Sequence, residues 1–155
     1  MQKICFTGHR SISEDRIRDI KDEITRILIS LADEDITTTL YNGGAKGFDL
    51  LAAETAIALK MRGLPIKLIM VLPSKDYTKN WSPAERAHLH NVLIEANETI
   101  YLTEKYYDGC MKVRNQYLVK CSNVCIAYMI NKRSGTGQTV RFARERGLTI
   151  INLAQ

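Results

Sequence analysis

The chain has 155 residues, close to the usual size of one domain, and its 45% hydrophobic and 25% charged residues are ordinary globular values. It has no apolar run near the ~20 residues that a membrane span needs. Its four cysteines show neither a CxxC pair nor the spacing of zinc ligands. We therefore expect one domain over residues 1–155, with no metal and no cofactor. The N-terminus has a strand pattern and not a signal-peptide pattern, which favours a cytoplasmic location.

Strand-like and helix-like segments alternate along the chain. Lys3–Thr7 has the pattern of a buried strand, and Ser13 is placed to cap the helix that follows. Thr37–Tyr41 is rich in β-branched residues and predicts a second strand. The further predicted strands are Ile66–Leu72, Thr99–Leu102, Val124–Tyr128 and Leu148–Leu153, and the further predicted helices are Leu50–Met61, one beginning at Ser82-Pro83, Cys110–Val119 and Val140–Arg146. This alternation predicts an α/β sandwich with a mainly parallel sheet of about six strands.

Three polar loops that contain glycine each follow a predicted strand and precede a predicted helix. Glycine lets the backbone turn tightly and approach a ligand, and the N–H groups of a helix's first turn favour an anion. A single loop of this kind is equally well explained as a turn without a ligand. Loops that follow parallel strands share one sheet edge, however, so three of them predict one binding site. The predicted ligand-binding residues in these loops are Thr7, Gly8, His9, Arg10, Gly43, Gly44, Ala45, Lys46, Gly47, Asp49, Ser134, Gly135, Thr136, Gly137 and Thr139.

Two of these residues, His9 and Asp49, are also candidates for catalysis. A histidine after a Thr-Gly turn can donate to a phosphate or act as an acid or base near neutral pH, although a loop histidine is commonly only solvated. Asp49 lies beside the glycine loop at a helix start, where a carboxylate can also serve simply as a favourable charge. Glu85 and Asp108 lie on other predicted edge loops and are weaker candidates, because a capping box with Ser82 explains Glu85.

Cations and aromatic residues are frequent in the predicted edge loops. A surplus of cations at one edge favours a phosphorylated ligand or nucleic acid, although exposed loops are often charged. The aromatic residues either stack on a base, at ~1–3 kcal/mol per base, or pack their loops onto the sheet. For Trp81, a hydrophobic staple ahead of the capping box is a further alternative. The cations are Arg10, Lys46, Lys75, Lys79, Lys105, Lys112, Arg114, Lys132 and Arg133, and the aromatic residues are Tyr77, Trp81, Tyr106 and Tyr107.

Several motifs resemble known families. Asn42–Asp49, followed by Ala52-Ala53-Glu54, resembles the signature of the DprA/Smf proteins, which bind single-stranded DNA, and so does Arg114–Ser122. Met111-x-x-Arg114, followed by a hydrophobic strand and a glycine–threonine loop, resembles the LOG-type phosphoribohydrolases. With its opening Thr7–Arg10, the chain is similar to the YpsA-like stand-alone members of the SLOG superfamily. The resemblance implies a Rossmann-like three-layer sandwich, a nucleotide or nucleotide-derived ligand such as ADP-ribose, ligand contacts at Arg114 and Asn115, and a homo-oligomer.

The chain lacks one catalytic residue of the LOG enzymes that it resembles. Those enzymes hold a glutamate three residues after the loop threonine, and here Thr139 or, in a shifted register, Arg141 takes that position. Neither can stabilise an oxocarbenium ion as a carboxylate does. We therefore predict a nucleotide-binding protein with a sensing or sequestering role. The alternatives are a LOG-like or related nucleotide-processing hydrolase and, more weakly, single-stranded DNA binding, because a shared fold does not fix function.

Overall fold

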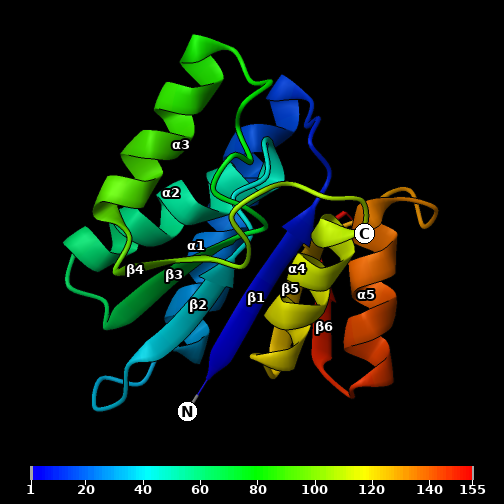
Figure 1. Ribbon diagram of the computed structural model, residues 1–155. Helices are drawn as coiled ribbons and strands as arrows, with labels where there is room; N and C mark the ends of the chain where they lie inside the picture. The colour runs from blue at the N-terminus through cyan, green and yellow to red at the C-terminus, as the bar shows by residue number, and fades with distance from the viewer. Residues whose placement is uncertain (1, 155) are drawn as a thin grey trace.

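A six-stranded parallel sheet organises residues 2–154, which the computed structural model describes (Figure 1). The sheet order is β4-β3-β2-β1-β5-β6, and every neighbouring pair is parallel. The predicted Rossmann-like α/β fold is thus confirmed, with a wholly parallel sheet. The elements are β1 (Lys3–Gly8), α1 (Glu14–Leu31), β2 (Thr38–Asn42), α2 (Phe48–Met61), β3 (Ile66–Leu72), α3 (Pro83–Glu95), β4 (Glu98–Tyr101), α4 (Cys110–Lys120), β5 (Val124–Tyr128), α5 (Gly135–Glu145) and β6 (Thr149–Asn152).

The strand order reverses at β1, which lies at the centre of the sheet. β1 pairs with β2 on one side and with β5 on the other, so that Ile4 lies between Leu40 and Val124. The loop after β1 leads to α1 on one face of the sheet, whereas the loop after β5 leads to α5 on the opposite face. Such a reversal leaves a crevice between the two loops at the carboxyl ends of the strands, where ligands of open α/β sheets bind.

Two hydrophobic cores lie on the two faces of the sheet. The larger core joins α1, α2 and α3 to the sheet through residues such as Ile24, Leu40 and Leu68. The smaller core joins α4 and α5 to the opposite face and includes Val71 and Leu118. Burial on both faces explains the nearly continuous apolar sequence of β3 and β5. Among residues 2–154, no helix is both long enough and apolar enough to cross a membrane.

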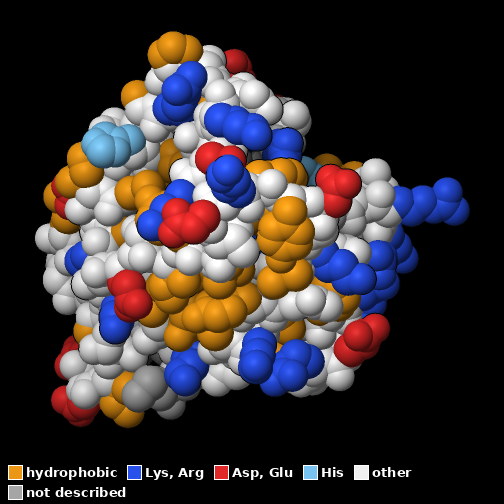
Figure 2. Space-filling model, viewed as in Figure 1, with side chains coloured by type: hydrophobic (Ala, Val, Ile, Leu, Met, Phe, Trp, Pro, Cys, Tyr) orange, Lys and Arg blue, Asp and Glu red, His pale blue; other side chains and the backbone are white. Residues whose placement is uncertain are grey.

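The sheet face that carries α4 and α5 is only partly covered by helices. α4 packs near the centre of the sheet, and α5 packs against β5 and β6. Figure 2 shows a hydrophobic patch on this face beside α4. Tyr41, Ile100 and Tyr117 pack against the smaller core and keep partial exposure. We refer to these three side chains as the apolar face patch.

Two sequence expectations about helix starts need correction. Ser13 precedes α1, but its side chain makes no capping hydrogen bond. Helix α5 begins at Gly135 and not at Val140, so the third polar loop is largely the first turn of the helix. The Ser134 hydroxyl accepts a hydrogen bond from the Gly137 N–H at 3.0 Å. This side-chain cap allows a helix to begin in a glycine-rich sequence that has no apolar periodicity.

Candidate functional site

A cavity of about 400 Å³ opens where β1 and β5 end. Its walls come from the β1–α1 loop, the start of α2, one face of α4 and the start of α5. We call it the switch-point cavity. The predicted site residues that line it are Thr7, Gly8, His9, Arg10, Ala45, Asp49, Arg114, Asn115, Ser134, Gly135 and Thr136. The three predicted loops thus meet at one edge of the sheet.

Asp49 is the most unusual group in this cavity. Its side chain is buried, with the residue only 4% exposed. Its Oδ2 accepts a hydrogen bond from the Ala45 N–H at 3.2 Å, whereas Oδ1 has no hydrogen-bond partner among the described residues. Burial raises the pKa of Asp49 from 3.8 to about 6, against the opposing effect of the Arg114 charge and the Ala45 N–H. A buried polar atom without a partner costs folding free energy, and a hydrogen-bond donor that reached this oxygen would remove that cost.

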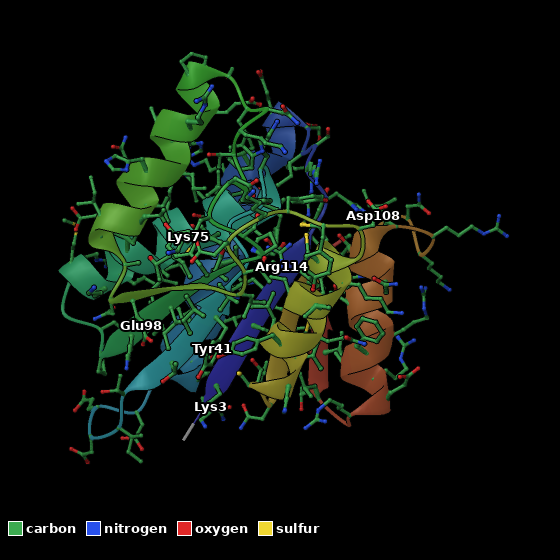
Figure 3. The ribbon with its side chains drawn as sticks, in the orientation of Figure 1. Lys3, Tyr41, Lys75, Glu98, Asp108 and Arg114 are labelled. Atoms are coloured by element: carbon green, nitrogen blue, oxygen red, sulfur yellow. The ribbon has the colours of Figure 1, made fainter. Side chains whose placement is uncertain are left out.

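Arg114 is a buried cation whose guanidinium is fixed by protein groups. The residue is 3% exposed. Nη1 donates to the Gly43 carbonyl and Nε donates to Asn115 Oδ1 at 2.9 Å. The guanidinium also lies close enough to Tyr77 to oppose the rise in the pKa of that phenol that burial causes. Figure 3 shows Arg114, a residue of α4, beside the carboxyl-terminal half of β1. Because two of its nitrogens already bind the protein, Arg114 can offer a ligand only part of its fork.

The glycine loop between β2 and α2 binds its own side chains. The Gly44 N–H donates to Asn42 Oδ1 at 2.9 Å, and the Asn42 amide donates to the Asp49 carbonyl at 2.7 Å. The Ala45 N–H likewise donates to the Asp49 carboxylate. Two of the backbone amides that the sequence suggested for an anion, those of Gly44 and Ala45, are therefore already bound within the protein. Gly43, Gly44 and Gly47 do not line the switch-point cavity. At Gly47, φ is +78° and an added Cβ would lie 2.2 Å from the Arg10 carbonyl oxygen, so this glycine packs one loop against another.

The start of α5 presents free backbone donors to the cavity. Within residues 2–154, the N–H groups of Gly135 and Thr136 have no hydrogen-bond partner, as expected for the first helical positions. A Cβ at Gly135 would meet no atom within 4 Å, so a ligand can approach this backbone closely. Two other predicted residues do not line the cavity. Gly137 packs closely against the Lys132 backbone, and the buried Thr139 donates a hydrogen bond to the Gly135 carbonyl at 3.1 Å.

His9 joins the first loop to the third. Its Nε2 accepts hydrogen bonds from the backbone N–H groups of Ile130 at 2.8 Å and Asn131 at 3.1 Å. The backbone of His9 also donates to the Tyr128 carbonyl and accepts from the Phe48 N–H. The imidazole therefore holds the loop after β5 in place, and its Nε2 lone pair is already used.

Lys46 lies outside the switch-point cavity, in a second one of about 280 Å³. Its ammonium binds the Glu85 carboxylate at 2.9 Å and lies 5.0 Å from the centre of the Trp81 ring. The capping box predicted for Glu85 is confirmed, and the same carboxylate also binds Lys46. We call this second site the aromatic cavity. It is lined by Arg10, Lys46, Asp76, Tyr77, Lys79, Asn80, Trp81, Tyr106 and Met111.

Sequence reasoning missed several residues of α4 and α5 that line the switch-point cavity. Met111 and Leu118 come from α4, and Gln138 comes from α5; Lys112, which the sequence indicated only as one of the edge-loop cations, lines the cavity as well. A signal was available in α4, because positions 111, 114, 115 and 118 share one face of a helix. Among residues 2–154, no group of three metal-ligating side chains is placed to hold a metal ion.

Comparison with known proteins agrees with this architecture. The profile of the YpsA family, described as the YspA SLOG family, matches residues 4–144. The chain belongs to the YspA SLOG family. It is 29% identical over 132 residues to the UPF0398 protein YpsA of Bacillus subtilis, covering 79% of this chain and 73% of that protein. It is 25% identical over 138 residues to the SPβ prophage-derived protein YoqJ of Bacillus subtilis, covering 81% of each chain.

Solved structures of DNA processing protein A (DprA) have the same fold as this SLOG-family chain. The Helicobacter pylori protein, whose structure concerns its single-stranded DNA binding mode, aligns with a TM-score of 0.68 at 21% identity over 96% of this chain. The Streptococcus pneumoniae protein aligns with a TM-score of 0.68 at 20% identity over 96% of this chain. The chain spans 63% and 49% of those two proteins. At this level of identity, the likeness describes the fold.

Proposed function

We propose that this SLOG-family protein binds a nucleotide or a nucleotide-derived molecule of the ADP-ribose type in the switch-point cavity, with a sensing or sequestering role in the cytoplasm. The site belongs to a fold and a family consistent with nucleotide or DNA binding. The cavity volume of about 400 Å³ lies within the ~300–1,000 Å³ usual for small-molecule sites. Buried Cys5 and Cys125, which resemble reduced core thiols, are compatible with the proposed compartment.

The unpartnered Oδ1 of Asp49 is the observation that carries this proposal. A buried carboxylate repels phosphate oxygens but accepts hydrogen bonds from hydroxyl groups. A ribose hydroxyl would therefore satisfy Oδ1, and a hydrogen bond to a charged group contributes ~1.5–3 kcal/mol. The ligand that fits this oxygen is thus a sugar-containing molecule and not a bare phosphate.

The phosphate end of the ligand has its own donors on the other side of the cavity. The free N–H groups of Gly135 and Thr136 stand at the positive end of the α5 dipole. Arg10 and Lys112 line the same cavity and add positive charge. One carboxylate and a set of anion donors in the same cavity support a ligand that carries both sugar hydroxyls and a phosphate.

Calorimetric titration of the purified protein with adenosine monophosphate and with ADP-ribose tests the proposal. We expect binding by the wild type, and a loss of ~10- to 150-fold in affinity for Asp49→Asn, from the value of one charge-assisted hydrogen bond. Asp22→Asn, on the exposed surface of α1, is the matched control and is expected to bind normally. Absence of binding by the wild type at millimolar ligand would reject the proposal. Mass spectrometry of small molecules released from the denatured protein would identify the natural ligand.

One observation favours the enzymatic alternative. A pKa of about 6 suits Asp49 to act as a general acid or base near neutral pH. Among the described residues, however, Asp49 is the only acidic residue that lines the cavity, and glycosidic hydrolysis commonly uses two carboxyl groups. Repeated release of free base from adenosine monophosphate, abolished in Asp49→Asn, would make the hydrolase the better account.

Single-stranded DNA binding is the weaker alternative, suggested by the DprA structures. The affinity of a DNA-binding protein falls steeply with salt because counterions are released from the phosphate backbone. A small ligand held by Asp49 and two backbone amides should show a shallow dependence. Titrations of an oligonucleotide and of adenosine monophosphate at 50 and 300 mM salt would separate the two.

We also propose that the protein forms a homodimer through the apolar face patch. The partial exposure of Tyr41 on β2 and of Tyr117 on α4 supports this location. Sedimentation velocity at micromolar concentration is expected to show a dimer for the wild type and a monomer for Tyr41→Glu. A monomeric wild type would reject the proposal.

A further inference from the structure

The aromatic cavity adjoins the switch-point cavity. Arg10 and Met111 line both, so the two sites share a wall. Tyr77 lines the aromatic cavity, and it lies close enough to Arg114 in the switch-point cavity for the guanidinium charge to act on its phenol. A ligand that occupies the first cavity can therefore extend past Arg10 into the second.

The aromatic cavity offers flat apolar surfaces for a ligand. Tyr77 and Trp81 form an edge-to-face pair with ring centres 5.2 Å apart. Tyr106, which lies on the loop before α4, is 46% exposed. The Asn80 amide adds both a donor and an acceptor at the rim. Aromatic walls with one amide are suited to a heterocyclic ring that has polar edges.

Two of the three cations that line this cavity are paired with neighbouring acids. Lys46 pairs with Glu85 at 2.9 Å, and Lys79 lies 3.9 Å from Asp76. Asp76 in turn accepts hydrogen bonds from the Ser74 hydroxyl and from the Tyr106 N–H, which fixes the loop that carries the Tyr106 ring. A second phosphate would have to compete with these carboxylates, whereas a neutral aromatic base would not.

We propose that the aromatic cavity binds the base of a nucleotide whose sugar-phosphate part occupies the switch-point cavity. This inference rests on the proposed function and specifies it further: the ligand is a nucleotide with an intact base. Arg10, at the junction, lies between the two parts of the ligand. Tyr106 supplies the exposed stacking surface, and Trp81, whose ring centre lies 5.0 Å from the Lys46 ammonium, lines the wall beside it.

Trp81, the single tryptophan of the chain, makes the test direct. Adenosine monophosphate and ribose 5-phosphate are titrated into wild type, Tyr106→Ala and Tyr107→Ala, with calorimetry for affinity and Trp81 fluorescence for base contact. Tyr107 is a matched control, because it is 45% exposed on the same loop but does not line the cavity. Thermal unfolding shows whether each variant is folded.

We expect adenosine monophosphate to bind about 5- to 150-fold more tightly than ribose 5-phosphate, and to change Trp81 fluorescence when the sugar phosphate does not. Tyr106→Ala should lose most of that difference, while Tyr107→Ala keeps it. Equal affinities for the two probes, or equal losses in the two variants, would overturn the base site and leave the proposed sugar-phosphate site standing. Failure of both probes to bind would overturn both.

Discussion

Replacing Asp49 with Asn is expected to stabilise the unliganded protein above pH 7. The carboxylate has a pKa of about 6 in the folded protein, against an ordinary value of 3.8, because burial disfavours its charge. The folded state therefore binds the Asp49 proton more tightly than the unfolded state does. Above pH 6, the folded protein bears the full free-energy cost of ionising the Asp49 carboxyl. The pKa rise from 3.8 to about 6 corresponds to about 3 kcal/mol of lost stability, which we take as an upper limit for the gain in unfolding free energy of Asp49→Asn.

Urea unfolding of the wild type and of Asp49→Asn at pH 8, 6 and 4 measures this gain directly. The difference in unfolding free energy should be largest at pH 8 and should shrink as the pH falls from 6 to 4, because the wild-type carboxyl then becomes neutral. At pH 8 the gain should raise Tm by up to ~10 °C for a domain of this size. Asp22→Asn should show no such trend. A destabilised Asp49→Asn at pH 8, or a difference independent of pH, would refute the reasoning.

Further predictions concern the other walls of the switch-point cavity. Gly135→Ala should keep the Tm of the wild type, because its Cβ meets no atom, yet should weaken nucleotide binding measured by calorimetry through steric contact with the ligand. His9→Ala should speed amide hydrogen exchange at Ile130 and Asn131, because it removes their acceptor. Arg114→Ala should lose ~10- to 100-fold in nucleotide affinity and should also lower Tm, because it leaves the Gly43 carbonyl unpaired in a buried site. Chromatography of adenosine monophosphate incubated with the wild type should show no free base, since the LOG-type glutamate is absent.

The sequence predicted the fold well because its signals are local. The strands Ile66–Leu72 and Val124–Tyr128 have the predicted bounds, since a strand buried on both faces is apolar along nearly its whole length. The start of α5 was not predicted, because its first turn depends on the Ser134 cap and contains no apolar residue. Alternation of strands and helices was enough to predict that the three loops meet at one edge.

The detailed roles within the site depend on contacts that no local pattern reveals. Lys46 belongs to the glycine-rich segment, but its side chain points to Glu85 and Trp81, far along the chain. The amides of Gly44 and Ala45 are taken up by Asn42 and Asp49 because the loop folds back on itself. Such pairings arise from tertiary packing, and sequence alone indicated only that these residues lie near one another.

Chemical-shift mapping by NMR on the nitrogen-15-labelled protein is the most direct test of the central claim, that a nucleotide occupies the cavity between β1 and β5. During titration with adenosine monophosphate, we predict saturable shifts of the Gly135, Thr136 and Ala45 amides, and saturation of the same amides at ~10- to 150-fold higher nucleotide concentration in Asp49→Asn. Shifts confined to surfaces away from these amides, or no saturable shift at millimolar nucleotide, would contradict the account.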